Sequence, residues 1–287
     1  MSEKKEKKKI DKRPIAFCVL SFFMAVCLFL ISVCISLRVT LLSQDYMLST
    51  MAEHEYYGQV TEEFREQLDS LGHASGLTTE FVNEFVASMD IREDVIRYID
   101  AFYSGSSTVV NKTPFKQKFR AALDSFAEQN QKEGTEPSEE ALEYLTNEAA
   151  ELYANSVEIP FFALIANFIY KLTAPMTIAI AALAVIAVVL GVIMFLANPE
   201  FKHRGYRYLS YAFSAAFICT VVIPAIMTAT GIIGKVNLTT MSLYNLFVNY
   251  FNGMLRYMWL FAGVYLFFGI LCFIVFANKH RRLLHNH

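Results

Sequence analysis

Cysteine is absent from the polar part of this sequence. All five cysteines, Cys18, Cys27, Cys34, Cys219 and Cys272, lie inside long apolar stretches. Many small secreted domains are stabilised by disulfide bonds. Such a fold is therefore excluded for the polar part. That part must instead be stable through its own hydrophobic core. We expect the cysteines to act as small buried hydrophobes.

Recognisable catalytic and metal-binding motifs are also absent. The sequence has no H-E-x-x-H or C-x-x-C pair, no G-x-S-x-G turn, no P-loop and no glycine-rich dinucleotide turn. His54 and His73 are the only histidines between the first and second apolar stretches, and we interpret them as solvated surface side chains rather than as a two-ligand metal site. We expect no metal, no cofactor and no nucleic acid among the ligands of this protein.

Charge is absent from four long stretches. None of them contains Asp, Glu, Lys, Arg or His, and each has about 20 residues or more, the length that a helix needs to cross about 30 Å of hydrocarbon. Carriers and pumps usually keep ionisable residues at membrane depth, so transport is disfavoured. The first stretch is too long for a cleaved signal peptide and is expected to be a retained anchor. The four predicted transmembrane helices are Ile15–Leu37, Ala174–Ala197, Tyr208–Ile233 and Tyr257–Ala277.

What the sequence does contain is a strong asymmetry of charge. Val39–Thr173 holds 23 Asp or Glu against 9 Lys or Arg, a net charge of −14, although the whole chain carries only −2. The remainder is therefore basic, with a net charge of +12. Because basic loops stay in the cytoplasm, we expect both termini inside the cell membrane and the acidic block outside it. The expected cytoplasmic segments are the basic tail 1–14, the turn 198–207 and the basic tail 278–287.

Helical periodicity runs through the predicted extracytoplasmic domain, residues 38–158, and no alternation of period two indicates strands. The first helix is expected to continue out of the membrane to about Ser70, and Thr78, Asp90 and Ser138 have the spacing of helix N-caps. The predicted fold class is therefore all-α: a polytopic membrane protein with four transmembrane helices and a helical extracytoplasmic domain between the first and second. Its core is predicted to contain Phe85, Ile99, Phe119 and Leu145.

Two segments beside the predicted spans carry little charge. Residues 159–173 are too few to cross a membrane and are expected to lie at its surface or to pack under the outer domain. Residues 234–256 are expected to form an outer amphipathic helix in the interface, because Asn237–Leu255 contains no charge. We predict that this helix packs under the acidic domain and closes the outer mouth of the bundle. Ser242, Asn245, Asn249 and Asn252 share one face of it, since they are spaced 3, 4 and 3 residues apart.

Four cations mark the outer ends of the four predicted spans, one for each span. They are expected either to anchor the spans by snorkelling or to hold the phosphates of lipids or of a lipid-linked substrate. With His54 and the asparagine face they form a candidate binding site, the outer-mouth cluster. Its residues are Arg38, His54, Lys171, Lys235, Asn245, Asn249, Asn252 and Arg256.

The layout of four spans with an outer domain after the first resembles that of bacterial lipoprotein intramolecular transacylases. The histidine-containing motif of that family matches no residues here. The resemblance implies a membrane enzyme acting on lipid or lipoprotein at the outer leaflet, which we keep as the alternative. The sequence favours a function without catalysis: a multi-pass plasma-membrane protein, similar in style to Gram-positive bacterial surface proteins. Its acidic domain would bind an extracytoplasmic protein or a lipid-linked partner, as a sensor, accessory subunit or assembly factor, and its spans would contact membrane lipid.

Overall fold

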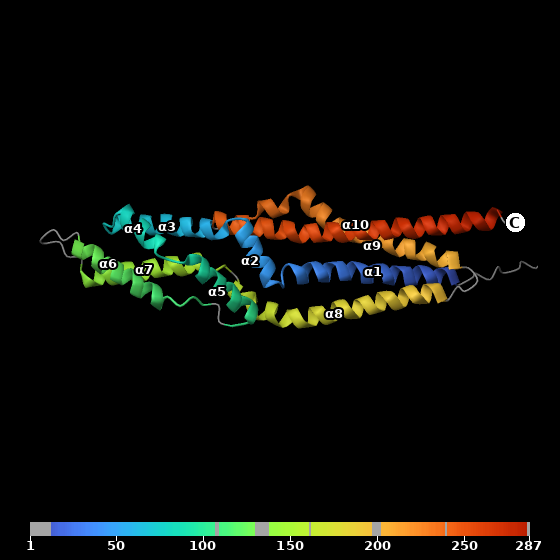
Figure 1. Ribbon diagram of the computed structural model, residues 1–287, viewed down its shortest axis with the longest axis horizontal. Coiled ribbons are helices and arrows are strands. Elements are labelled where there is room, and N and C mark those ends of the chain that lie inside the picture. The colour runs from blue at the N-terminus through green and yellow to red at the C-terminus, as the bar shows by residue number, and fades with distance from the viewer. Residues whose placement is uncertain are drawn as a thin grey trace, which may run out of the picture. The chain divides into compact units, whose positions relative to one another are not determined.

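The computed structural model describes residues 13–106, 109–129, 138–160, 162–196, 202–238 and 240–285 (Figure 1). Every regular element in these ranges is a helix and none of them contains a strand, so the all-α prediction is confirmed. Most of the predicted N-terminal tail and much of the predicted turn at 198–207 lie outside the described residues. The helices are α1 (Arg13–Val39), α2 (Gln44–Glu53), α3 (Tyr56–Ala74), α4 (Thr79–Ala87), α5 (Ile91–Ser104), α6 (Thr113–Gln129), α7 (Glu139–Val157), α8 (Phe162–Leu196), α9 (Lys202–Thr230), η1 (Ile232–Lys235) and α10 (Met241–His285).

The chain divides into two compact units. One, the apolar unit, comprises Met1–Arg38, Ala174–Ile233 and Gly253–His287. The other, the acidic domain, comprises Val39–Thr173 and Gly234–Asn252. The acidic domain therefore recruits the first turns of α10, which lie far along the chain from the rest of it.

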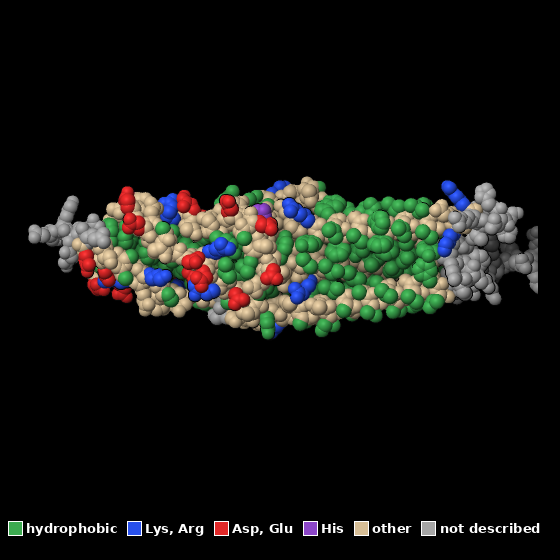
Figure 2. Space-filling model, viewed as in Figure 1, with side chains coloured by type: hydrophobic (Ala, Val, Ile, Leu, Met, Phe, Trp, Pro, Cys, Tyr) green, Lys and Arg blue, Asp and Glu red, His purple; other side chains and the backbone are tan. Residues whose placement is uncertain are grey.

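The apolar unit exposes many hydrophobic side chains, and Figure 2 shows them gathered on the face in view. Ile178, Val185 and Phe267 are among the large apolar side chains that remain more than half exposed. Soluble proteins rarely expose such continuous apolar surface, whereas a bilayer covers it. Within the described residues, four helical stretches are long and apolar enough to cross a membrane. They are Pro14–Val39, Glu139–Leu196, which takes in both α7 and α8, Gly205–Thr230 and Met241–Lys279.

Side-chain hydroxyls join the helices of the apolar unit. Ser21 of α1 donates to the carbonyl of Tyr208 in α9 over 3.0 Å, and Ser210 of α9 donates to the carbonyl of Gly269 in α10 over 3.0 Å. Such bonds need no ionised group and satisfy polar atoms away from water. The cysteines follow the expectation of burial only in part. Cys272 is buried, Cys27 and Cys34 are intermediate, and Cys18 and Cys219 are exposed on an apolar helix surface.

Two helices continue through positions where the sequence suggested a boundary. Pro175, expected near the start of a span, lies inside α8, which begins at Phe162. Proline removes only one backbone donor, and neighbouring groups in apolar helices tolerate that loss. At the other end of the chain, α10 begins at Met241 and passes Tyr257 without a break, so the uncharged segment and the apolar run after it form one helix.

The acidic domain is built from α2 to α7, the start of α8 and the start of α10. Three predicted N-caps are confirmed: the side chains of Thr78, Asp90 and Ser138 accept hydrogen bonds from the backbone N–H groups three residues ahead. Each bond satisfies one of the donors that a helix start leaves open, so each cap sets where α4, α5 or α7 begins.

The core of the acidic domain contains all four residues predicted for it, Phe85, Ile99, Phe119 and Leu145. Aromatic rings dominate its centre, and the centroids of the Phe85 and Phe119 rings lie 4.9 Å apart at a steep interplanar angle. Edge-to-face pairs of this kind add to the stability gained from burial. Leu246 and Tyr250 of α10 belong to the same core.

The prediction of one long helix leaving the first span is wrong. The chain breaks after Val39, and Ser43 caps α2 by accepting a hydrogen bond from the N–H of Tyr46. A second break follows at Glu55, which takes a left-handed conformation with φ of 54°. This conformation is unfavourable for a residue with a side chain. The burial of Met51 and Tyr56 on either side offsets that cost.

Candidate functional site

The start of α10 is held by a carboxylate from α3. Glu63 accepts two hydrogen bonds from Ser242: one from its backbone N–H over 2.8 Å and one from its hydroxyl over 2.5 Å. Thr240 adds a local cap by accepting from the N–H of Leu243 over 3.4 Å. A negative charge at a helix N-terminus also interacts favourably with the helix dipole. Glu63 therefore fixes the position at which α10 enters the acidic domain.

The asparagine face continues this contact along α10. The side-chain amide of Asn245 donates to the Oε1 atom of Gln59 in α3 over 3.0 Å. Its neighbours Leu246 and Tyr250 are buried in the core, and the Tyr250 ring lies 5.4 Å from that of Tyr46. The expected packing of this segment against the acidic domain is thus seen at Asn245.

A cavity of about 500 Å³ lies beside this contact, inside the acidic domain. We call it the α10 cavity. Residues of α3, α5, α7, α8 and α10 reach it, together with the Glu158–Pro160 connection. Its lining residues are Tyr56, Glu63, Gln67, Tyr98, Asn155, Ser156, Glu158, Ile159, Pro160, Ala163, Thr240, Ser242 and Leu243.

Carboxylates and phenols set the chemistry of the α10 cavity. The described residues of its lining include the carboxylates Glu63 and Glu158 but no lysine, arginine or histidine. Glu158 accepts a hydrogen bond from the N–H of Val110 over 3.0 Å through one oxygen. Tyr98 donates to the carbonyl of Ile159 over 3.2 Å, and burial raises the pKa of Tyr98 to about 12. The cavity therefore holds two carboxylates beside a phenol that stays protonated at neutral pH.

Tyr56 is as deeply buried as Ser242 in the cavity wall, with 2% of its surface exposed. Its hydroxyl forms no hydrogen bond with any residue in the described ranges. Burial raises the pKa of Tyr56 above its ordinary value, and the nearby charge of Glu63 raises it further. Because no described residue bonds to this hydroxyl, it keeps its capacity to donate or accept a hydrogen bond from a ligand.

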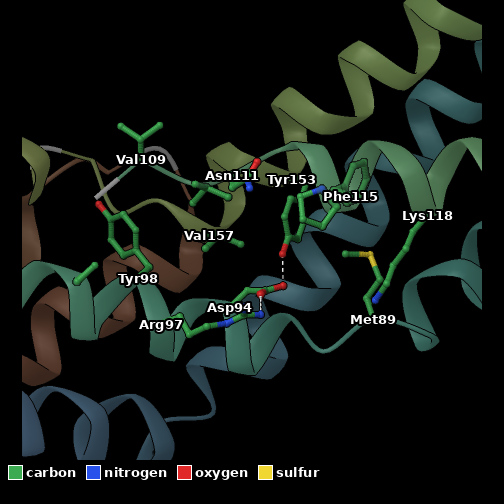
Figure 3. A pocket seen from close by; sticks show the side chains of 13 residues that line it. Met89, Asp94, Arg97, Tyr98, Val109, Asn111, Phe115, Lys118, Tyr153 and Val157 are labelled. Carbon is green, nitrogen blue, oxygen red and sulfur yellow. Dashed lines mark hydrogen bonds and ion pairs between the residues drawn. The ribbon is translucent and has the colours of Figure 1, made fainter. Parts of the chain in front are cut away.

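A second cavity, of about 310 Å³, shares Tyr98 of α5 with the first and is shown in Figure 3. Asp94 lies at its centre, where it accepts hydrogen bonds from the guanidinium of Arg97 and from the hydroxyl of Tyr153. Phe115 and Lys118 complete this part of the lining. Since the carboxylate is already neutralised by Arg97, we assign Asp94 a structural role in joining α5 to α7.

The predicted outer-mouth cluster is divided between the two units. Arg38 and Arg256 belong to the apolar unit, and the other six residues belong to the acidic domain. Arg38 donates to the hydroxyl of Thr177 over 3.4 Å, whereas Arg256 is exposed. His54, Lys171, Lys235 and Asn252 are exposed, Asn249 is half-buried, and Asn245 contacts Gln59. Convergence of the cluster on one lipid-sized cavity stays a prediction.

Sequence analysis missed the residues that line the α10 cavity, except for those on α10 itself. Glu63 and Glu158 are two of many acidic residues, and Tyr56 follows a helix break that the sequence analysis did not place. The one available signal was the uncharged start of α10, whose polar face needs partners. Among the described residues, no three His, Cys, Asp or Glu side chains are grouped to hold a metal ion.

Comparison with known proteins returned no matching family model, no matching curated protein and no matching solved structure.

Proposed function

We propose that this protein is a multi-pass protein of the cell membrane that uses its acidic helical domain to bind a partner or ligand outside the cytoplasm. Four apolar helical stretches and the exposed hydrophobic surface of the apolar unit support the membrane location. The net charge of −14 on Val39–Thr173, against +12 on the remainder, supports the orientation, with both termini in the cytoplasm.

The α10 cavity carries the binding half of this proposal. A cavity of about 500 Å³ is within the usual size range of ligand sites, and the polar groups of its lining converge on a partly apolar wall. Ala163 of α8 and Leu243 of α10 both line it, and each helix continues into a candidate span. Binding there would favour one arrangement of these helix starts, which suits a sensor or an accessory subunit.

Cysteine labelling in intact cells tests the orientation. In a chain whose native cysteines are replaced by alanine, Ala74→Cys on the exposed end of α3 should react with a membrane-impermeant maleimide. Asn278→Cys, exposed near the end of α10, should react only after the cells are permeabilised. Labelling of Asn278→Cys in intact cells, with Ala74→Cys protected, would reverse the proposed orientation.

Site-specific photocrosslinking in living cells tests the binding. A photoreactive amino acid at Asn155, an exposed residue of the cavity lining, should yield a defined adduct. The same group at Glu140, exposed on the same helix but outside the cavity, is the matched control. Identical patterns at the two positions would show that the cavity captures nothing, and the binding half of the proposal would be lost.

A further inference from the structure

The α10 cavity brings two carboxylates together. Some carboxylates of the outer surface pair with bases: Glu62 with Arg65, Glu151 with Lys112, and Glu139 with Arg120. Among the described residues, Glu63 and Glu158 receive hydrogen bonds only from neutral groups, Ser242 and the backbone of Val110, and no base lines the cavity wall. The two negative charges of the cavity are therefore left without a counter-charge from its lining.

The second observation is the unused hydroxyl of Tyr56. It belongs to a side chain with 2% of its surface exposed, it lines the cavity, and no described residue accepts or donates a hydrogen bond to it. Two further polar side chains of the lining, those of Gln67 and Asn155, are exposed. A ligand with a polar head would thus find charge, a phenol oxygen and amides within one cavity.

The remaining wall is apolar. Ile159, Pro160, Ala163 and Leu243 contribute carbon surface on which the body of a ligand would lie. Small-molecule sites commonly combine an apolar wall with a few convergent polar groups that fix the orientation of the ligand. The size of about 500 Å³ accommodates an organic molecule rather than a bare metal ion.

We propose that the α10 cavity binds a small organic cation, an ammonium or guanidinium group on an apolar body. This inference rests on the proposed function and names the chemistry of its ligand. Glu63 and Glu158 supply the negative charge, the Tyr56 oxygen accepts a hydrogen bond from the cationic head, and the apolar wall covers the body. Hydrogen bonds between a cation and a carboxylate are among the strongest in proteins.

Three probes of nearly equal size test the charge preference on the purified full-length chain in lipid nanodiscs. They are phenethylamine, phenethyl alcohol and phenylacetate, with binding measured by calorimetry. We expect the amine to bind about tenfold or more tightly than the alcohol, because the alcohol lacks the charge-assisted hydrogen bonds. Phenylacetate should not bind. Equal affinities for the amine and the alcohol, or tighter binding of phenylacetate, would overturn the proposal.

Variants separate the cavity from the general negative charge of the domain. Tyr56→Phe removes a hydroxyl that bonds to no described residue, and Glu158→Gln keeps an oxygen for the N–H of Val110, so both should fold. Each should weaken amine binding about tenfold. Glu140→Gln changes the net charge equally on an exposed turn of α7 and should leave the affinity unchanged. If Glu158→Gln and Glu140→Gln weakened amine binding equally, the affinity would come from non-specific attraction to the acidic domain, and the proposed site would be refuted.

A fourth probe, a lysine residue within a glycine peptide with both ends blocked, separates two sources of the cation. Tighter binding of this peptide than of phenethylamine would assign the natural group to a lysine side chain of a protein partner. Weaker binding would assign it to a free amine. Failure of all four probes refutes this inference but leaves the proposed function open to the crosslinking test. Conversely, binding of amines by a domain that labels as cytoplasmic would refute the orientation alone.

Discussion

Replacing Glu63 with alanine should release the start of α10 from the acidic domain. The change removes the only acceptor on α3 for the Ser242 hydroxyl. Because Ser242 is 2% exposed, water cannot easily take the place of that acceptor. Hydrogen bonds to a charged group each contribute about 1.5–3 kcal/mol, and a favourable charge at a helix N-terminus adds about 0.3–1 kcal/mol. Glu63 itself is only half-buried, so we take the lower end, a loss of about 3 kcal/mol.

Hydrogen exchange of the full-length chain in nanodiscs measures this loss directly. Amides in the first turns of α10, from Leu243 to Tyr250, should exchange about a hundredfold faster in Glu63→Ala, because about 1.4 kcal/mol corresponds to tenfold. Amides later in α10 should change little. Glu66→Ala, an exposed carboxylate on the same helix, is the matched control and should leave exchange unaltered.

Two further variants divide the effect into its parts. Glu63→Gln keeps one oxygen acceptor but removes the charge, so its loss should be smaller than that of Glu63→Ala. In a double-mutant cycle, Glu63→Ala and Ser242→Ala should be non-additive by about 1–3 kcal/mol, since both remove the bond from the Ser242 hydroxyl to Glu63. Additive losses would show that the hydroxyl bond contributes nothing, and protection of Leu243 that persists in Glu63→Ala would show that the carboxylate does not hold α10 and that the core contacts of Tyr250 suffice.

The remaining predictions concern the core, the asparagine face and the phenols. Phe119→Ala should lower the free energy of unfolding of the acidic domain by about 3–5 kcal/mol in denaturant titrations, because its ring is fully buried, whereas Tyr144→Ala at an exposed site should change it by less than about 0.5 kcal/mol. Asn245→Leu should cost about 1 kcal/mol by removing the bond to Gln59, while Asn249→Leu should be nearly neutral; equal effects would show that the face acts as a whole. Burial raises the pKa of Tyr98 and of Tyr103 to about 12, so their contribution to stability is fully present below the unfolded-state pKa of about 10 and is lost as the pH rises through about 12. Tyrosinate absorbance of the folded chain should accordingly show these two phenols titrating above the unfolded range, and titration at about 10 in the folded chain would contradict their burial.

Much of the fold could be predicted because it depends on local rules. The caps at Thr78, Asp90 and Ser138 follow from short side chains that accept bonds from N–H groups three residues ahead, which is a relation within one turn. Phe119 was placed in the core because apolar residues repeated with a helical period. The candidate spans follow from length and the absence of charge alone.

Other features depended on contacts between distant parts of the chain. The break at Glu55 has no glycine or proline to mark it, and burial of its neighbours Met51 and Tyr56 decides it. The sequence analysis separated an outer helix from the span that begins at Tyr257, because the composition changes there. The helix geometry does not change, and α10 passes Tyr257 without a break. Periodicity shows which face of a helix needs partners, but it does not name them.

The sequence by itself therefore determined the all-helical class, the four apolar stretches, the concentration of acid in one block and the core of that block, since each follows from composition or from spacing within a helix. Only the tertiary structure decided that Glu63 meets Ser242, 179 positions away, and that Tyr56, Tyr98 and Glu158 surround one cavity. The physical reason is that local sequence does not distinguish one acidic residue on a polar helix face from another before the chain folds. Its neighbours, and hence its charge balance and its capacity to bind, are set by the packing of helices and not by its own sequence context.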